Sequence, residues 1–371
     1  MSSDIRAGRQ LRAEVIDRSL CTLCGACTGL CPYFVAYRGR VAALDDCTVD
    51  QGRCYAFCPR TPTDLDAVSR ATFGEPLDTS PIGRTVDVLM TRAARDDVRA
   101  KSQCGGTVSA LAAFALERGL VDSAVLTESD ASLLPSGIAV RESSAVLERA
   151  RSNYVAAPTL AAFNREANRD DVRRIAVVAT PCQALALGKM RASPLENRNN
   201  IDKLSLVIGL FCTWALDFER FTRFLGERTP LDRISKLDIP PPPANVLQVY
   251  NGSERIDIPL DDVRPFIRPA CNHCLDMTAE FADLSIGAAE GIDGWNTLVV
   301  RSDRGRELVE AALAAGVIES RPLPDANLDH LKGASLGKRR RALANITQLT
   351  GSDDDLLYLE IDAETRRKLL G

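Results

Sequence analysis

The chain has 371 residues, of which 45% are hydrophobic, so it can bury one large core or two modest ones and is not expected to be disordered. Its 46 Lys and Arg residues against 50 Asp and Glu residues give a net charge of -4, which argues against nucleic-acid binding. The chain has twelve Cys but two His. With so little imidazole for zinc ligation or general-base catalysis, the chemistry is expected to depend on thiols.

Disulfide bonds are one use for an even number of cysteines, and small secreted proteins depend on them. A chain of this length does not need such crosslinks, and its first residues, MSSDIRAGRQLRAEVIDRSL, lack the apolar run of a signal peptide. No stretch reaches the roughly eighteen consecutive apolar residues of a transmembrane segment. We therefore expect a cytoplasmic protein whose clustered cysteines form metal or redox sites.

The first motif is the run CTLCGACTGLC, which is followed directly by Pro32. Its spacing is typical of bacterial ferredoxins, in which three thiolates bind one 4Fe-4S cluster and the fourth binds another. Gly25 lets the backbone approach the inorganic sulfides, and Pro32 ends the ligand loop. Zinc is the alternative, but it would need two paired knuckles rather than one run. The candidate ligands are Cys21, Cys24, Cys27 and Cys31.

A second, incomplete cysteine group follows, and it consists of Cys47, Cys54 and Cys58. By the pseudo-twofold logic of ferredoxins, Cys58 completes the first cluster, while Cys31 joins Cys47 and Cys54 on a second one. The second cluster is then one ligand short. Either a carboxylate or a distant cysteine fills the gap, or the cluster has three irons, or Cys47 and Cys54 are structural thiols beside a single cluster. The nearby carboxylates are Asp45, Asp46 and Asp50.

The cysteine pattern predicts a small ferredoxin-like α+β iron-sulfur domain over residues 1–72, and a linker with Pro and Gly follows over 73–84. The main domain spans 85–371, with an N-terminal part over about 85–170 and a C-terminal part over about 171–371. Alternating strand and helix patterns there favour an α/β core with a mixed, mostly parallel sheet. The expected strands are 85–90, 123–127, 175–179 and 204–212, and the expected helices are 106–118, 182–190 and 215–226, with another helix ending over 146–151.

Two further elements are predicted toward the C-terminus. Residues 247–250 and 253–258 flank Asn251 and Gly252, a pair that favours a β-hairpin turn. The tail beyond Gly333 is expected to be helical. Its basic run, residues 338–341, is typical of a solvated helix face.

Two short loops are candidates for ligand binding. The loop 102–107 contains Gly105 and Gly106 just before a predicted helix, so its N–H groups can approach a phosphate or a flavin ring. The loop 179–183 follows a predicted strand and opens a helix, which is where open α/β sheets place their ligands. Either loop taken alone is equally consistent with an ordinary capped turn.

Four blocks of sequence together resemble a known family. In chain order they are SQCGGTVSALAAFALERGLVDSAV, IAVVATPCQALALGKM, LVIGLFC and RPACNHCLDMTAEFADLSIGAAEGIDGWNTLVVRSDRG. From Thr85 onward, the chain resembles the beta subunit of coenzyme F420-reducing hydrogenase and of F420-dependent formate dehydrogenase. Several members of that family also carry an N-terminal ferredoxin module.

The resemblance implies a flavoprotein core that binds FAD and holds a 4Fe-4S cluster close to the flavin. The matching cysteines are Cys182, Cys212, Cys271 and Cys274, with zinc as the alternative for the last pair. Two to three 4Fe-4S clusters are therefore expected in all. The residues expected to contact or border FAD are Gln103, Cys104, Gly105, Gly106, Thr107, Thr180, Pro181, Lys236 and Asn296.

Cys104 departs from the family pattern, which does not generally have a cysteine between the Gln and the two Gly. If Cys104 were the missing ligand of the second ferredoxin cluster, the twelve thiols would supply four ligands to each of three clusters. A partly buried thiol near the flavin is the favoured interpretation. Both histidines, His273 and His330, are expected to be structural.

The resemblance implies an oxidoreductase that converts a hydride into single electrons, with no catalytic residue identified. The expected path runs from coenzyme F420 or NAD(P)H through FAD and the clusters to a redox partner subunit, or in the reverse direction. Two other functions stay open. One is an adaptor subunit without its own substrate in a formate dehydrogenase, hydrogenase or heterodisulfide-reductase complex. The other is a reductase that takes electrons from ferredoxin to reduce an organic substrate.

Overall fold

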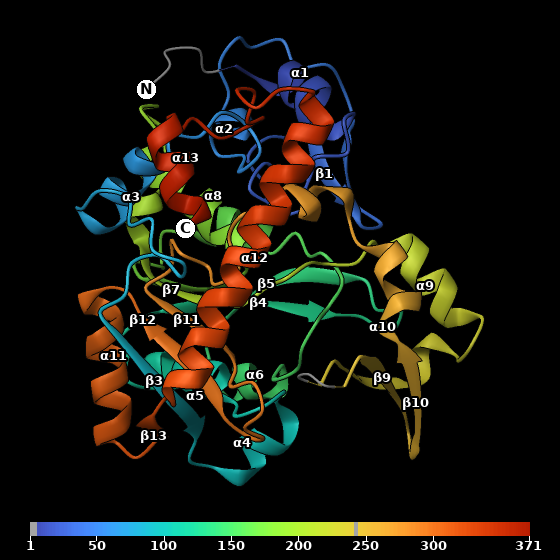
Figure 1. Ribbon diagram of the computed structural model, residues 1–371, viewed down its shortest axis with the longest axis vertical. Coiled ribbons are helices and arrows are strands. Elements are labelled where there is room, and N and C mark those ends of the chain that lie inside the picture. The colour runs from blue at the N-terminus through green and yellow to red at the C-terminus, as the bar shows by residue number, and fades with distance from the viewer. Residues whose placement is uncertain (1–5, 241–243) are drawn as a thin grey trace.

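A large mixed sheet organises the main part of the chain in a computed structural model that describes residues 6–240 and 244–371 (Figure 1). The sheet has eight strands, and helices cover both of its faces. Its strands, in spatial order, are β13 (Ile318–Pro322), β3 (Asp87–Ala93), β12 (Asn296–Val300), β11 (Leu284–Ala288), β7 (Leu204–Leu210), β6 (Ile175–Ala179), β4 (Ser123–Ser129) and β5 (Pro135–Val140).

The strand directions confirm the mixed α/β class but not the expected predominance of parallel pairs. The pairs β11–β7, β7–β6 and β6–β4 are parallel, whereas the other four neighbouring pairs are antiparallel. The expectation of a mostly parallel sheet is therefore wrong. Short connections explain two of the four antiparallel pairs, β4–β5 and β11–β12, because the loops 130–134 and 289–295 are too short for a crossover.

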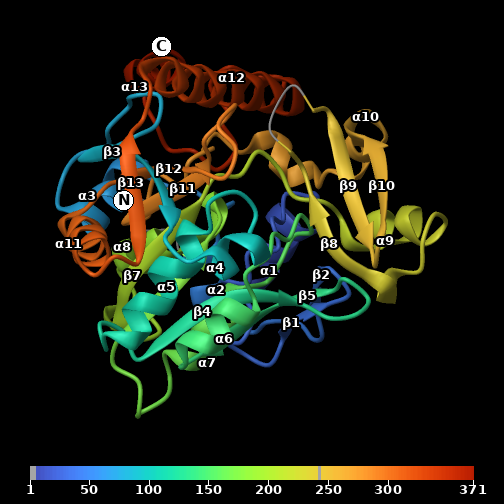
Figure 2. The same cartoon turned by 90° about the horizontal axis from the view of Figure 1, so that it is seen from below.

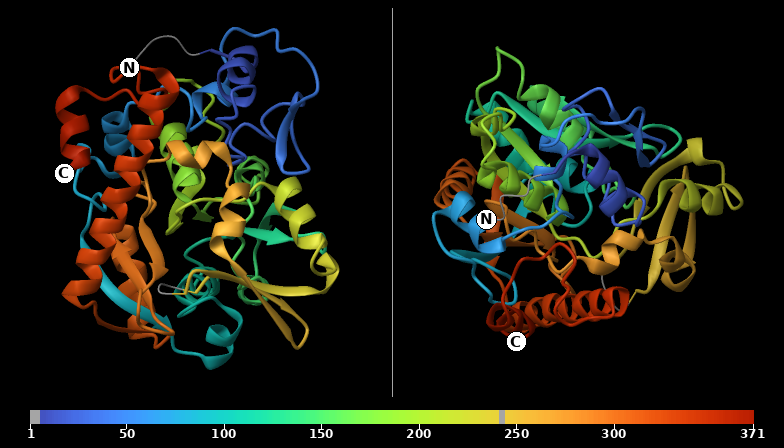
Figure 3. Two further views of the ribbon diagram at one scale, coloured as in Figure 1. Left: turned by 45° about the vertical axis from the view of Figure 1, so that its right-hand side comes forward. Right: turned by 90° about the horizontal axis from the view of Figure 1, so that it is seen from above.

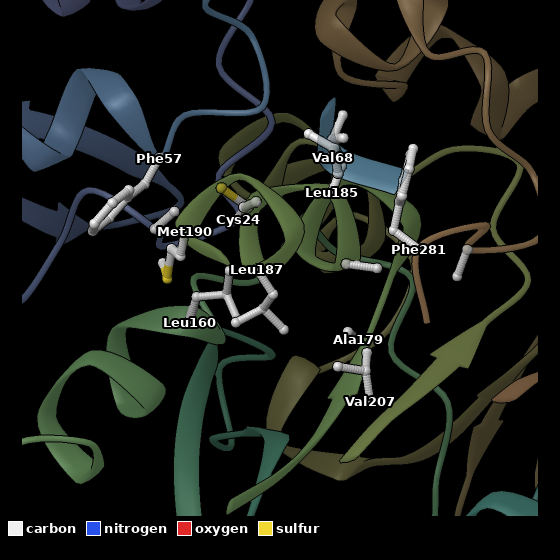
Figure 4. Packing of buried hydrophobic residues seen from close by; sticks show 14 of the residues in the cluster. Cys24, Phe57, Val68, Leu160, Ala179, Leu185, Leu187, Met190, Val207 and Phe281 are labelled. Atoms are coloured by element: carbon white, nitrogen blue, oxygen red, sulfur yellow. The ribbon is translucent and has the colours of Figure 1, made fainter. Parts of the chain in front are cut away.

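Alternate side chains of the central strands face two different cores, as the two-residue period of a strand requires. On β6, Val177 faces the core that includes α7 and α8, whereas Ala176 faces the core that includes α5 and α11. Figure 4 shows Leu185 and Leu187 of α8 in the first core, above Ala179 and Val207 of the sheet. The helices of the main part are α4 (Asp96–Lys101), α5 (Thr107–Glu117), α6 (Ser143–Glu148), α7 (Leu160–Glu166), α8 (Pro181–Ala192), α9 (Phe218–Gly226), α10 (Leu260–Val263), α11 (Asp303–Ala314), α12 (Asp325–Thr350) and α13 (Ala363–Leu370).

The N-terminal cysteine-rich module lies above the sheet in Figure 1. It packs directly on the start of α7. A Cβ on Gly25 would lie 2.5 Å from the carbonyl oxygen of Pro158, just before α7, and Gly25 has a φ of +88°. The Leu160 N–H donates to the Cys24 carbonyl at 3.0 Å. The cysteine loop is therefore fixed against the main fold. The module contains α1 (Gly8–Leu11), a π-helical turn (Arg12–Ile16), β1 (Phe34–Tyr37), β2 (Arg40–Ala43), α2 (Arg53–Ala56) and α3 (Leu65–Phe73).

A second, three-stranded sheet projects from the side of the molecule (Figure 2). It consists of β8 (Ile234–Asp238), β9 (Val246–Asn251) and β10 (Glu254–Pro259). The predicted hairpin is confirmed, because Asn251 pairs with Glu254 and Gly252 has a φ of +60°.

The long helix α12 passes along the molecule from the N-terminal module to the far end of the large sheet (Figures 1 and 3). Its basic run is only partly solvated: Arg340 and Arg341 are exposed, but Lys338 and Arg339 are buried. The expectation of a solvated face is wrong for these two residues, since α12 packs its basic face onto the protein. Over the described parts of the chain, no helix combines the length and apolarity that crossing a membrane requires.

Candidate functional site

The predicted ligand loops meet at one edge of the large sheet. Strands β4, β6, β7 and β11 run in the same direction, so their carboxyl ends lie at a shared edge. Thr180 follows β6 there, and Cys212 lies just beyond β7. Strand β12 runs the opposite way, so Asn296 begins it at this edge. In open α/β sheets this edge is the usual place for a ligand.

Asn296 holds the 102–107 loop in place. Its side-chain Oδ1 accepts a hydrogen bond from the Thr107 N–H at 3.2 Å, and its Nδ2 donates to the Gly287 carbonyl at 3.1 Å. A Cβ on Gly105 would lie 2.7 Å from this Oδ1, so only glycine allows the close approach. Gly106 has a φ of +73° and forms the N-cap of α5. The loop thus forms the N-terminal end of α5 at this edge, and helix N-terminal ends commonly bind anionic groups.

The Gln103 side chain joins this loop to the projecting sheet. Its amide donates to the Tyr154 hydroxyl at 2.6 Å and to Asp238 at 2.8 Å, and it also accepts a hydrogen bond from Ser152. Lys236 forms an ion pair with Asp238 at 2.9 Å. The structure therefore brings Gln103, Lys236 and Asn296 together around one loop. Sequence inspection did not single out Tyr154 or Asp238, which lie in segments without a motif.

Thr180 and Pro181 form the start of α8. The Thr180 N–H donates to the Gln183 side chain at 2.8 Å, which is half of a capping box. The Thr180 hydroxyl lies 3.4 Å from the Cys182 sulfur. The structure therefore places these residues beside a cysteine, and the hydrogen bonds described for Thr180 do not reach the 102–107 loop.

Four cysteines from three separate segments converge beside this edge, and we call them the inner site. Cys182 lies in the first turn of α8, Cys212 follows β7, and Cys271 and Cys274 lie at the turn Pro269–His273. Burial raises the pKa of Cys212, and charge repulsion from the other three sulfurs raises it further. Four buried thiols that repel one another as thiolates need a compensating positive charge, which iron can supply.

Four more cysteines converge in the N-terminal module, and we call them the first ferredoxin site. Burial raises the pKa of Cys27, and the sulfurs of Cys21, Cys24 and Cys58 raise it further. Burial also raises the pKa of Cys24, and the next largest cause is Cys182 of the inner site. Cys54 also acts on Cys27, so the pairing of Cys58 with the first three cysteines stays a prediction. The effect of Cys182 on Cys24 indicates that the two sites are neighbours.

Cys31, Cys47 and Cys54 gather in a third group, the outer site. Burial raises the pKa of Cys54 to about 12, and the sulfurs of Cys31 and Cys47 are the next causes. Glycines allow the chain to come close here: a Cβ on Gly52 would lie 3.2 Å from the Cys54 sulfur. Cys104 is not part of this group. Burial raises its pKa to about 11, and the charged groups that act on it are Asp238, Lys236 and Asp293.

Buried cations surround the cysteine sites, and sequence inspection did not identify them. Lys338 donates to the Cys212 and Asp276 carbonyls, each at 2.7 Å, and Arg268 donates to the Cys21 carbonyl at 3.0 Å. Lys189 is held by four oxygens of the segment 61–63 at 2.9 to 3.1 Å. Arg60 directly follows Cys58 and Pro59, and this position beside a cysteine motif was the one sequence feature that could have pointed to a buried cation.

Unpaired buried atoms test whether an anionic cluster fits. The Arg60 and Arg268 Nε atoms and the His273 Nδ1 atom are buried without a hydrogen-bond partner. Among the described residues, no three His, Cys, Asp or Glu side chains are grouped as ligands of a single metal ion. A cubane distributes its four thiolates over four irons, so it does not require the tight grouping of side chains that a single zinc ion needs. The residues of the inner site therefore fit an iron-sulfur cluster.

Short contacts connect the 102–107 loop to the inner site by two routes. Along the first route, the Asn296 side chain donates to the Gly287 carbonyl. Gly287 packs so closely on Phe211 that a Cβ would clash with the ring, and Phe211 directly precedes Cys212 in the chain. Along the second, Tyr154 accepts from Gln103 and its carbonyl binds the Leu216 N–H, while the neighbouring Ala215 N–H donates to the Cys271 sulfur at 3.4 Å.

Comparisons with known proteins identify the family. Residues 88–164 and 172–326 match the N-terminal and C-terminal parts of the coenzyme F420 hydrogenase/dehydrogenase beta subunit, and residues 14–35 match a 4Fe-4S binding domain. The chain is 26% identical over 270 residues to the coenzyme F420 hydrogenase subunit beta of Methanothermobacter thermautotrophicus, covering 71% of this chain and 95% of that protein. It is 28% identical over 313 residues to the coenzyme F420-dependent sulfite reductase of Methanocaldococcus jannaschii, covering 80% of this chain but 47% of that protein.

A solved structure shares the fold. It is a chain in a structure of the F420-reducing NiFe hydrogenase complex from Methanosarcina barkeri, with a TM-score of 0.66 and 23% identity, covering 72% of this chain and 94% of that chain. The named relatives are F420-dependent oxidoreductases or their subunits. The chain belongs to the coenzyme F420 hydrogenase/dehydrogenase beta-subunit family and carries a 4Fe-4S binding domain in its N-terminal module.

Proposed function

We propose that this chain is an oxidoreductase subunit that binds FAD at the 102–107 loop and 4Fe-4S clusters at its cysteine sites. It exchanges a hydride with a carrier of the coenzyme F420 type and passes single electrons to or from a partner protein. The observation that carries the proposal is the run of contacts from Gln103 and Asn296 to the inner site, whose Cys182 lies close enough to Cys24 of the first ferredoxin site for its charge to act on that thiol.

Bound FAD would supply two-electron chemistry with the hydride carrier, and bound clusters would supply one-electron transfer. The chain's own residues bind and orient these groups. Asn296 fixes the loop whose N–H groups meet a phosphate or a flavin ring, and Asp238 fixes Gln103 and Lys236 beside it. Lys338 and Arg60 offset the negative charge of the inner thiolates. None of these roles requires a catalytic base, which suits a chain with two His.

The outer site is the proposed exit to the partner. Leu44 and Val49 flank Cys47 in sequence and are 65% and 57% exposed, which is unusual for apolar side chains. All twelve cysteines are free thiols, and we place the chain in a reducing compartment such as the cytoplasm.

The proposal is tested by anaerobic reduction of the purified protein. We expect bound FAD, about twelve irons per chain, and bleaching of the flavin absorbance by the reduced F420 carrier but not by NADH or NADPH. Bleaching by a nicotinamide alone would change the assigned carrier. Bound FAD that no soluble hydride carrier reduces would favour the adaptor function, in which electrons pass only between protein partners. A preparation that cannot be loaded with FAD would contradict the proposal.

A further inference from the structure

Arg60 occupies an unusual position between two of the cysteine sites. It follows the first-site ligand Cys58 by two residues, yet its guanidinium donates to the Ala270 carbonyl at 3.3 Å, next to Cys271 of the inner site. The inner-site cysteines Cys274 and Cys182 lie close enough for their charges to act on it, and Arg60 is 4% exposed. A single buried cation therefore lies between a segment that carries Cys58 of the first site and a segment that carries Cys271 of the inner site.

The fold holds this guanidinium rigidly. Its central carbon lies 4.4 Å from the centroid of the Tyr358 ring. Tyr358 is itself fixed, because its hydroxyl donates to the His273 carbonyl at 2.9 Å and its carbonyl accepts from the Thr63 N–H at 2.7 Å. Cation–π stacking and two such anchors leave the arginine little freedom to turn away from the sulfurs.

Arg60 forms no ion pair with a carboxylate among the residues that the structure describes, and its Nε is buried without a hydrogen-bond partner. Arg339, by contrast, forms a buried ion pair with Glu280. A buried cation without a carboxylate partner is costly, so the anionic cluster ligands are its natural counter-charge.

Lys338 provides a comparison on the opposite side. Its ammonium bonds the Cys212 carbonyl, and the charges that favour it most are Cys274 and Cys212, both in the inner site. It has no contact described with the first ferredoxin cysteines. Lys338 therefore lies beside one site, whereas Arg60 lies beside Cys58 of the first site as well as beside the inner site.

We propose that Arg60 is a positioning residue whose charge sets the reduction potentials of the inner and first ferredoxin clusters together. The inference rests on the proposed function, which places clusters at both sites. A positive charge stabilises the more negative, reduced form of a cluster, so its removal shifts the midpoint potential to more negative values.

The test is a mediated redox titration, followed by electron paramagnetic resonance, of the full chain and four variants. Arg60→Met is expected to shift the midpoints of both clusters to more negative values, and Arg60→Lys to restore part of each shift. Lys338→Met is expected to shift only the inner cluster. Arg341→Met, which changes an exposed residue three positions away on the same helix, is the matched control and is expected to shift neither.

Iron content separates the inference from the proposed function. Unmodified protein with about four irons fewer than expected, and no signal from the inner site, would refute the cluster assignment and the inference with it. Full iron with Arg60→Met midpoints that are unchanged, or changed at one cluster only, would overturn the inference alone. If Arg60→Met does not fold, Arg60→Gln, which keeps a hydrogen-bond donor without the charge, must give the same two shifts.

Discussion

The inner and outer cysteine sites differ in how the fold builds them. The inner site draws Cys182, Cys212 and the Cys271–Cys274 pair from distant segments, and buried Lys338 and Arg60 enclose it. The outer site takes Cys31, Cys47 and Cys54 from one stretch of the N-terminal module, with exposed neighbours. The comparison indicates that the inner cysteines are brought together by tertiary structure, whereas the positions of the outer cysteines depend on local chain geometry. Three changes test this difference.

The largest effect is expected from Cys274→Ala. The variant should lose about four irons per chain and melt at a lower temperature, because Arg60 and Lys338 would stay buried after losing a thiolate partner. Iron analysis and a circular-dichroism melt under anaerobic conditions measure both effects. Cys104→Ala is the control and should keep all its iron. An unchanged iron content in Cys274→Ala would remove this residue from the ligand set.

A smaller effect is expected from Cys47→Ala. We expect a loss of about three to four irons with little change in the melting temperature, because Cys47 lies in a partly exposed segment without buried cations of its own. The same two measurements apply. Full iron in this variant would show that Cys47 is a structural thiol, and a large fall in melting temperature would contradict the proposed contrast between the sites.

The smallest effect is expected from replacing Asp45, Asp46 and Asp50 together with Asn. Cys31 and Cys47 are the groups that raise the pKa of Cys54 most after burial, and no carboxylate is among the main causes. The Asp45 carboxylate instead accepts the Asp46 N–H at 2.8 Å. Iron content and the cluster spectrum should therefore match the unmodified protein. Lost iron would identify a carboxylate as the fourth ligand.

Local motifs predicted the cysteine groups because ligand spacing is itself local. The run from Cys21 to Cys31 predicted a 4Fe-4S binding domain, which the family comparison confirms over residues 14–35. The division of the cysteines between two clusters stays a prediction. The hairpin at Asn251 and Gly252 was predictable for the same reason. The resemblance to the family added the distant cysteines, which no spacing rule connects.

Long-range packing accounts for what the sequence did not reveal. Lys338 and Arg339 lie in a run of four basic residues that indicates solvent, and only the docking of α12 buries them. Tyr154 and Asp238 have no motif and meet Gln103 only after the projecting sheet folds against the 102–107 loop. The antiparallel direction of β12 beside β11 likewise depends on the short connection between them, and the hydrophobic pattern of the strands does not show this.

The position of Lys338 has a consequence for biosynthesis. Chains emerge from the ribosome N-terminus first, so the ferredoxin cysteines are available long before α12. The inner site needs Cys182, Cys274 and finally Lys338, and closing such long loops has a high entropic cost. Cofactor loading should therefore proceed in order along the chain, with the cluster beside the large sheet completed last.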